Sequence, residues 1–284
     1  MATVLDREEY IEQAYFFRVL RERLASNMAA QDVLDRISEE ILSTTRLPFA
    51  IQFLATELKH TGILSSGFAH LPHYFTPFQT LIVQRTEEEG MRFSFETALV
   101  ILEREAEYRA GKLTPTGLFV YQFEVLSRNR IGYDAGLTAM MGDPLYDQTW
   151  RDYLDMVRRQ VGTVDFADLI YVRSDLYLRE QQRQDPNYEL PVPALFGEKE
   201  GKISKANRGR DPLYLFAALQ RHLGYPEVPR YKPRDDLPAK FDTLQAKFRE
   251  LEMRLKLVEG EVRGQIDLSQ FGKPDLLSGP KDDE

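Results

Sequence analysis

Four side chains of the kinds that bind divalent metals lie close together in this sequence. Glu57 and His60 are three residues apart, and His70 and His73 follow them. On a helix, a carboxylate and an imidazole at positions i and i+3 can reach one metal ion, and helical bundles combine two such pairs with further glutamates. One hypothesis is therefore a metal-dependent helical enzyme that binds a divalent metal at residues 57–73. Its remaining carboxylates would come from Glu103, Glu107 or Glu124.

The surroundings of these residues favour a different interpretation. The chain contains no second Glu-x-x-His pair, so half of the di-metal pattern is missing. Ile51, Leu54 and Leu58 mark the apolar face of the predicted helix, and at about 100° per residue His60 lies almost opposite that face. The alternative is an exposed glutamate with loop histidines bonded to the backbone, and we predict no other cofactor.

The most basic stretch of the chain is a second candidate site. Its five cations are interleaved with small residues: Lys199, Lys202, Lys205, Arg208 and Arg210. Spaced cations on a glycine-punctuated loop neutralise phosphates, which suggests a nucleic-acid-associated factor as another hypothesis. The stretch contains no interleaved aromatic side chains to stack on bases. The alternative is a solvated arm, or a surface that docks on the acidic helices of the same protein.

The most regular pattern predicts a coiled coil over residues 237–262. Apolar residues alternate in steps of four and three, with Phe241, Phe248, Leu255 and Val262 at a positions and Leu237, Leu244, Leu251 and Val258 at d positions. In a parallel, in-register pair, Lys247 at g faces Glu252 at e of the other chain, and Arg254 faces Glu259. Both contacts are attractive, so the pattern predicts a parallel homodimer. The alternative is that the helix packs on its own chain, which its phenylalanines would suit.

Composition narrows the classes of function. The 284 residues are 43% hydrophobic, which is enough for a sizeable core, and 45 acidic against 37 basic residues argue against a surface built wholly for polyanions. The absence of cysteine excludes disulfides, thiolate nucleophiles and cysteine-ligated zinc. An acidic N-terminal stretch and short apolar runs predict neither a secretory signal nor a membrane span. We therefore expect a cytoplasmic protein that does not associate with membranes.

Helical periodicity predicts the elements that must position these residues. Helices are expected at about 4–28, 30–43, from Pro48, 77–88, from Ser94, 115–130, around 150–157 and through 166–183, with a loop from 62 to 77. The fold class is mainly α. Residues 1–183 form a bundle-like body, 184–235 an extended, basic, proline- and glycine-containing arm with one short helix at 211–223, 236–266 the coiled-coil helix and 267–284 a polar tail.

No catalytic motif can be nominated from this sequence. It has no nucleophile elbow, no G-x-G-x-x-G and no recognisable Ser/His/Asp arrangement. The glutamates at 103, 105 and 107 are expected on a solvated face, and the aromatic residues at 10 and 15–17 in helix packing. Our first hypothesis is a non-catalytic scaffold or adaptor that acts through protein–protein interaction with itself and with an unidentified protein.

Overall fold

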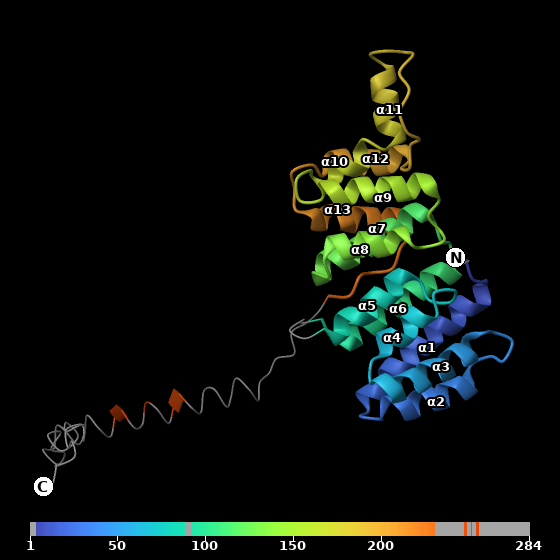
Figure 1. Ribbon diagram of the computed structural model, residues 1–284. Coiled ribbons are helices and arrows are strands. Elements are labelled where there is room, and N and C mark those ends of the chain that lie inside the picture. The colour runs from blue at the N-terminus through green and yellow to red at the C-terminus, as the bar shows by residue number, and fades with distance from the viewer. Residues whose placement is uncertain (1–3, 89–92, 231–246, 249–250, 252–253, 256–284) are drawn as a thin grey trace, which may run out of the picture. The chain divides into compact units, whose positions relative to one another are not determined.

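A computed structural model describes residues 4–88 and 93–230, together with 247, 248, 251, 254 and 255. The chain divides into two compact units, Met1–Tyr231 and Lys232–Glu284, which we call unit 1 and unit 2. The described residues of unit 1 form thirteen α-helices and no strand longer than an isolated bridge (Figure 1). The predicted mainly helical class is confirmed.

The first six helices of unit 1 surround a core that contains the aromatic residues of α1. Tyr10, Phe16 and Phe17 are buried, as the sequence predicted. α1 packs along α6, α2 packs against α3, and α4 contacts both α3 and α5. These helices are α1 (Arg7–Ala25), α2 (Ala30–Glu40), α3 (Leu47–Thr61), α4 (Leu64–His70), α5 (Pro77–Glu87) and α6 (Phe95–Ala110).

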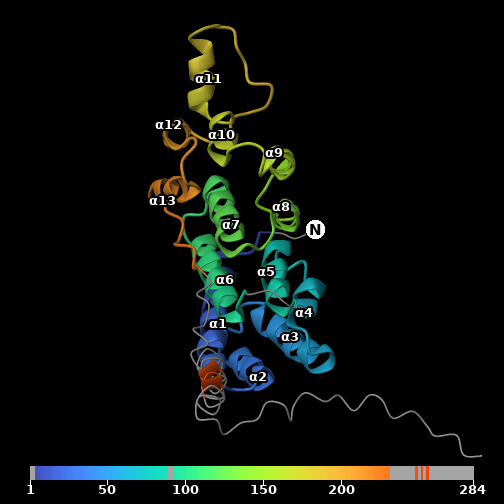
Figure 2. The same ribbon diagram turned by 90° about the vertical axis from the view of Figure 1, so that its left-hand side faces the viewer.

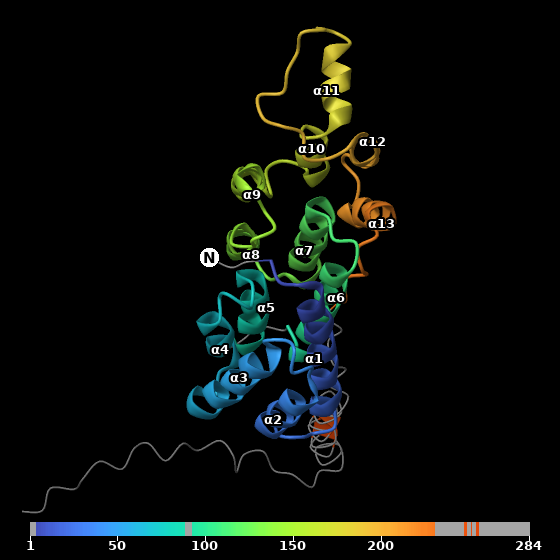
Figure 3. The same ribbon diagram turned by 90° about the vertical axis from the view of Figure 1, so that its right-hand side faces the viewer.

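The other seven helices begin with α7, against which α8 and α13 pack. Figures 2 and 3 show α5, α8 and α9 following one another along one side of unit 1, with α13 packed on α7. Phe123 on α7 stacks on Phe166 with the ring centroids 3.8 Å apart. None of the described helices is long and apolar enough to cross a bilayer. The seven are α7 (Pro115–Asn129), α8 (Tyr133–Met141), α9 (Gln148–Gln160), α10 (Phe166–Tyr171), α11 (Asp175–Gln182), α12 (Glu198–Ala206) and α13 (Pro212–Leu223).

Local capping signals predicted the boundaries of several helices correctly. The Thr114 hydroxyl accepts a hydrogen bond from the backbone N–H of Gly117 at the start of α7. Asp211 caps α13 in the same way, and Gly224 ends it with a left-handed backbone at φ 69°. Asp6 stands at the N-cap of α1, but its side chain makes no capping hydrogen bond.

Two helices occur where glycines suggested loops. α4 occupies residues that the sequence predicted as a loop, and α12 lies in the segment predicted as an arm with a single short helix. A Cβ on Gly67 would lie 2.7 Å from Leu54 Cδ2, and one on Gly201 would lie 2.4 Å from Ser174 Oγ. These glycines allow close helix packing rather than ending the helices. The periodicity of a single segment does not predict which of the two roles a glycine has.

Two further differences concern α8 and the pair α10 and α11. α8 was not predicted, and the single helix expected through residues 166–183 is interrupted before Ser174. There the Ser174 hydroxyl accepts a hydrogen bond from Tyr177 N to cap α11, and Asp175 N donates to Phe196 O at 2.9 Å. This backbone hydrogen bond to Phe196, a residue outside both helices, takes the place of one turn of the predicted continuous helix.

Replacing Gly201 with alanine is expected to lower the free energy of unfolding. The added methyl group meets Ser174 and Leu176 Cβ at distances below 3 Å. This overpacking costs about 1–3 kcal/mol and outweighs the gain in helix propensity. Urea denaturation followed by circular dichroism would measure the loss. Gly111→Ala is the matched control, since its methyl group would make ordinary contacts; equal effects of the two substitutions would contradict this account.

Candidate functional site

The structure brings together two of the four predicted metal-binding residues. Nδ1 of His70 lies 3.6 Å from Oε1 of Glu57, and the Ser66 hydroxyl donates to the same oxygen at 2.9 Å. His60 and His73 are exposed. Within residues 4–88 and 93–230 no three His, Cys, Asp or Glu side chains are grouped to hold a metal ion. A bound metal stays a prediction that elemental analysis of protein purified without chelator would test.

Two of the glutamates considered as further metal ligands have other partners. Glu103 accepts from Arg21 at 2.9 Å. Glu124 forms an ion pair with Arg128 and accepts a hydrogen bond from the Tyr225 hydroxyl at 2.7 Å. The last contact attaches the segment after α13 to α7, so Glu124 has a structural partner far along the chain.

Three of the five cations in the basic stretch pair with carboxylates of the same unit. Lys202 binds Glu198 within α12 at 2.6 Å, and Lys205 reaches Glu180 on α11 at 2.7 Å. Arg208 binds Asp168 on α10 and stacks 4.0 Å above the Tyr171 ring. The hydrogen bond from Lys205 lowers the pKa of Glu180. These contacts fit the interpretation that the stretch docks on the protein's own acidic helices, and they leave less free charge for phosphates.

Three of the eight predicted coiled-coil residues are described. Phe248, Leu251 and Leu255 have helical backbone and are 65%, 61% and 60% exposed. Side chains three and four residues apart lie on one side of a helix, so the three form an apolar row in water. The other predicted residues, Leu237, Phe241, Leu244, Val258 and Val262, lie outside the described residues.

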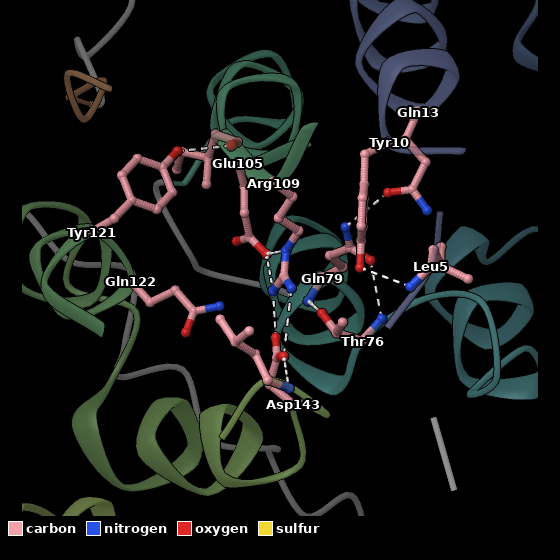
Figure 4. Close-up of polar contacts among 12 residues, drawn as sticks. Leu5, Tyr10, Gln13, Thr76, Gln79, Glu105, Arg109, Tyr121, Gln122 and Asp143 are labelled. Carbon is pink, nitrogen blue, oxygen red and sulfur yellow. Dashed lines mark hydrogen bonds and ion pairs between the residues drawn. The ribbon is translucent and has the colours of Figure 1, made fainter. Parts of the chain in front are cut away.

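A buried ion network that the sequence analysis did not predict joins α6 to the turn after α8 (Figure 4). Nη2 of Arg109 donates to Oε1 of Glu105 at 2.7 Å and also to Oδ2 of Asp143. Oδ1 of Asp143 accepts from the backbone N–H of Leu145 at 3.0 Å. The three charged side chains are at most 1% exposed. Two carboxylates therefore share one guanidinium out of contact with water.

Uncharged polar groups line the rest of this network. Tyr10 on α1 places its ring centroid 5.8 Å from the Arg109 guanidinium, and Tyr146 donates to Gln122 Oε1 at 2.9 Å. Figure 4 shows the Gln122 amide directed toward Glu105. Among the described residues, Gln122 Nε2 and Glu105 Oε2 have no hydrogen-bond partner. Burial raises the pKa of Glu105, and the Asp143 carboxylate adds to the rise while Arg109 opposes it.

A second polar group connects α1 to the segment that leads into α5. Glu9 accepts a hydrogen bond from the Tyr74 hydroxyl at 2.7 Å and one from Arg46 N at 2.9 Å. Nearby, Gln79 Nε2 donates to Gln13 Oε1 at 3.3 Å. Burial and the Glu9 carboxylate raise the pKa of Tyr74. Glu9 thus binds the start of α3 and the segment before α5.

An apolar pocket of about 510 Å³ lies between α4, α5 and α8. Phe68 and Phe75 lie among its lining residues, and Asp134 is its one titratable lining residue. The Asp134 carboxylate is mostly exposed and bound to Arg158 at 2.9 Å. This pocket can accommodate an apolar group, but its lining offers no acid/base pair.

Comparison with known proteins adds nothing to these contacts. No family model, curated protein or solved structure matches this chain.

The sequence did contain one signal for the buried network. At helical spacing Glu105 and Arg109 fall on the same face of α6 as Ala98 and Leu102, which are buried. The expectation of a solvated face was wrong for Glu103 and Glu105, which are buried, whereas Glu107 is exposed. Opposite charges four residues apart on an apolar helix face indicate a buried ion pair. Their third partner, Asp143, lies 34 residues after Arg109, so local spacing does not predict it.

Proposed function

We propose that this chain is a non-catalytic helical scaffold or adaptor that associates with itself and with another protein. The observation that carries the proposal is the exposed row of Phe248, Leu251 and Leu255 on helical backbone. Single exposed apolar residues are common on protein surfaces, but a continuous row marks an interaction surface. Apolar area removed from water contributes about 25 cal/mol per Å², so pairing of this row is favourable.

Charge favours a second copy as the partner of this row. In a parallel pair Lys247 meets Glu252, and Arg254 meets Glu259, as the heptad positions require. The simplest antiparallel register sets Lys247 against Arg254, which is repulsive. Each attractive pair contributes only a few tenths of a kcal/mol, so the charges select the orientation and the apolar seam provides the affinity.

Two observations favour association over catalysis or nucleic-acid binding. The buried network around Arg109 is closed to solvent and cannot receive a substrate, because its three charged side chains are at most 1% exposed. In the basic stretch, Lys202, Lys205 and Arg208 already bind carboxylates of the same unit.

Light scattering tests this proposal directly. The full chain is expected to have twice the 33.0 kDa mass of one chain, and a shortened chain that ends before Asp236 the mass of a monomer. The shortened chain keeps the core of unit 1, including Tyr225 and Val228. A monomer in both samples would rule out self-association, and a dimer in both would place the interface outside residues 236–284.

A further inference from the structure

α3 presents a second apolar face, on the side away from its core contacts. Phe49 is 73% exposed and Phe53 38% exposed, while Ile51 and Leu54 on the opposite side are buried. The ring of Phe53 lies edge-to-face with His70 of α4, with 6.3 Å between the centroids. Two neighbouring phenylalanines in water on a well-packed helix indicate a surface that a partner covers.

The spacing on this side of α3 matches that of a helix-pairing seam. Phe49, Phe53, Thr56 and His60 follow one another in steps of four, three and four, and all four are exposed. At about 100° per residue they fall within an arc of about 60°. Such a narrow stripe receives the side chains of one helix, as a and d positions do in a coiled coil.

Positive charge flanks the stripe. The Arg46 side chain, one turn before Phe49, binds the buried Glu9 at 3.3 Å but is more than half exposed, and Lys59 is exposed next to the stripe. Across residues 46–70, all of which are described, Glu57 is the one carboxylate. It is mostly buried and accepts the hydroxyl hydrogen bond of Ser66. The face therefore presents Lys59, His60 and the exposed part of Arg46, and no residue of 46–70 brings an exposed carboxylate to it.

We propose that this surface, the α3 face (Arg46, Phe49, Phe53, Thr56, Lys59 and His60), docks an amphipathic helix of another protein whose apolar stripe is flanked by Asp or Glu. Carboxylates beside the apolar stripe complement Lys59 and the exposed part of Arg46, so charge selects the partner and its orientation while the apolar stripe provides the affinity. The inference rests on the proposed function, because it supplies the partner that an adaptor needs. Its test uses no residue of 236–284, so either idea can fail without the other.

Two other occupants fit this face less well. A second copy would bring another Arg46 and Lys59 to the contact with no exposed carboxylate from α3 to meet them. A lipid surface would have to accept Thr56 and His60 within the same narrow stripe, and neither side chain favours an apolar interior.

Binding of two synthetic helical peptides to the full chain tests the proposal. Both peptides carry the same leucine seam, flanked by glutamate in one and by lysine in the other, and fluorescence anisotropy measures their affinities. The glutamate-flanked peptide is expected to bind at least tenfold more tightly. Phe49→Glu and, separately, Phe53→Glu are expected to weaken its binding at least tenfold. Tyr214→Glu, at an exposed aromatic residue of α13, is the matched control and is expected to leave binding unchanged.

A charge reversal separates helix docking from nonspecific apolar adhesion. Lys59→Glu is expected to weaken binding of the glutamate-flanked peptide several-fold and to strengthen binding of the lysine-flanked one. Equal binding of both peptides, absence of binding, or binding insensitive to Phe49→Glu and Phe53→Glu would overturn the proposal. A smaller mass of the full chain in light scattering after Phe49→Glu would assign the face to a second copy. Loss of cosedimentation with phosphatidylserine vesicles in that variant would assign it to a membrane, and both results also overturn the proposal.

Discussion

Replacing Arg109 with methionine is expected to lower the free energy of unfolding by about 3–5 kcal/mol. Methionine fills much of the volume of the arginine side chain but leaves the carboxylates of Glu105 and Asp143 buried without their cation. An unpaired charge in a site that excludes water is among the most destabilising changes a core can suffer. Urea denaturation followed by circular dichroism at neutral pH would measure the loss.

The matched control is an ion pair of the same sequence spacing on the surface. Arg159 binds Asp155 four residues earlier on α9, and its side chain is exposed. Arg159→Met is expected to cost less than about 1 kcal/mol, because water replaces the lost partner. A similar loss for Arg159→Met and Arg109→Met would show that burial of the Arg109 network contributes nothing beyond an ordinary pair.

Glu105→Gln provides the complementary change in the same network. It leaves one carboxylate, Asp143, for one guanidinium, and its amide oxygen can still accept from Arg109. We expect a loss well below that of Arg109→Met. Burial raises the pKa of Glu105 in the folded state above its value in the unfolded state. The contribution of Glu105 to stability is therefore complete at a pH below the unfolded-state pKa, and it is lost as the pH rises through the folded-state pKa. As the pH rises through that range, the free energy of unfolding of Glu105→Gln should therefore fall less than that of the unchanged protein.

The structure separates what local sequence can predict from what it cannot. The first residues of α7 and α13 were predictable because the side chains of Thr114 and Asp211 cap backbone N–H groups within the next three residues. α4 and α12 were missed because Gly67 and Gly201 were interpreted without the side chains that approach them from Leu54 and Ser174. Whether a glycine ends a helix or allows another segment to pack closely against it depends on contacts with that other segment. The spacing of residues within one segment does not predict such contacts.

The candidate sites show the same limit. The spacing of Glu57, His60, His70 and His73 is visible in the sequence, but only Glu57 and His70 meet, because the other two side chains point into solvent. The interpretation of residues 199–210 as a surface against acidic helices depended on charge balance, a property of the whole chain, and the contacts of α12 fit it. Charge complementarity within a chain is thus easier to infer than the convergence of four ligands on one point.

Replacing both Phe248 and Leu255 with glutamate is expected to weaken self-association about a hundredfold or more. Each substitution places a carboxylate in the predicted seam of both chains, and a combined loss of about 3 kcal/mol corresponds to that factor. Sedimentation equilibrium over a range of concentrations would measure the dissociation constant. Met253→Glu, at the heptad f position of the same segment, adds a carboxylate outside the seam and is expected to leave the constant nearly unchanged.

Charge exchange then distinguishes parallel pairing from the alternatives. A chain with Lys247→Glu and Arg254→Glu places like charges across a parallel seam and is expected to remain monomeric at concentrations where the parent is a dimer. A second chain with Glu252→Lys and Glu259→Lys is expected to do the same, and an equimolar mixture of the two to form heterodimers.

A helix packed on its own chain would leave both variants and their mixture monomeric, as the parent would be. An antiparallel pair would leave each variant on its own as dimeric as the parent, because in its simplest register g positions face g positions and e positions face e positions, so each exchange replaces one like-charge contact with another. All three arrangements would bury the row of residues 248, 251 and 255, which is exposed here, so it is the response of the charges, rather than of the apolar seam, that decides among them.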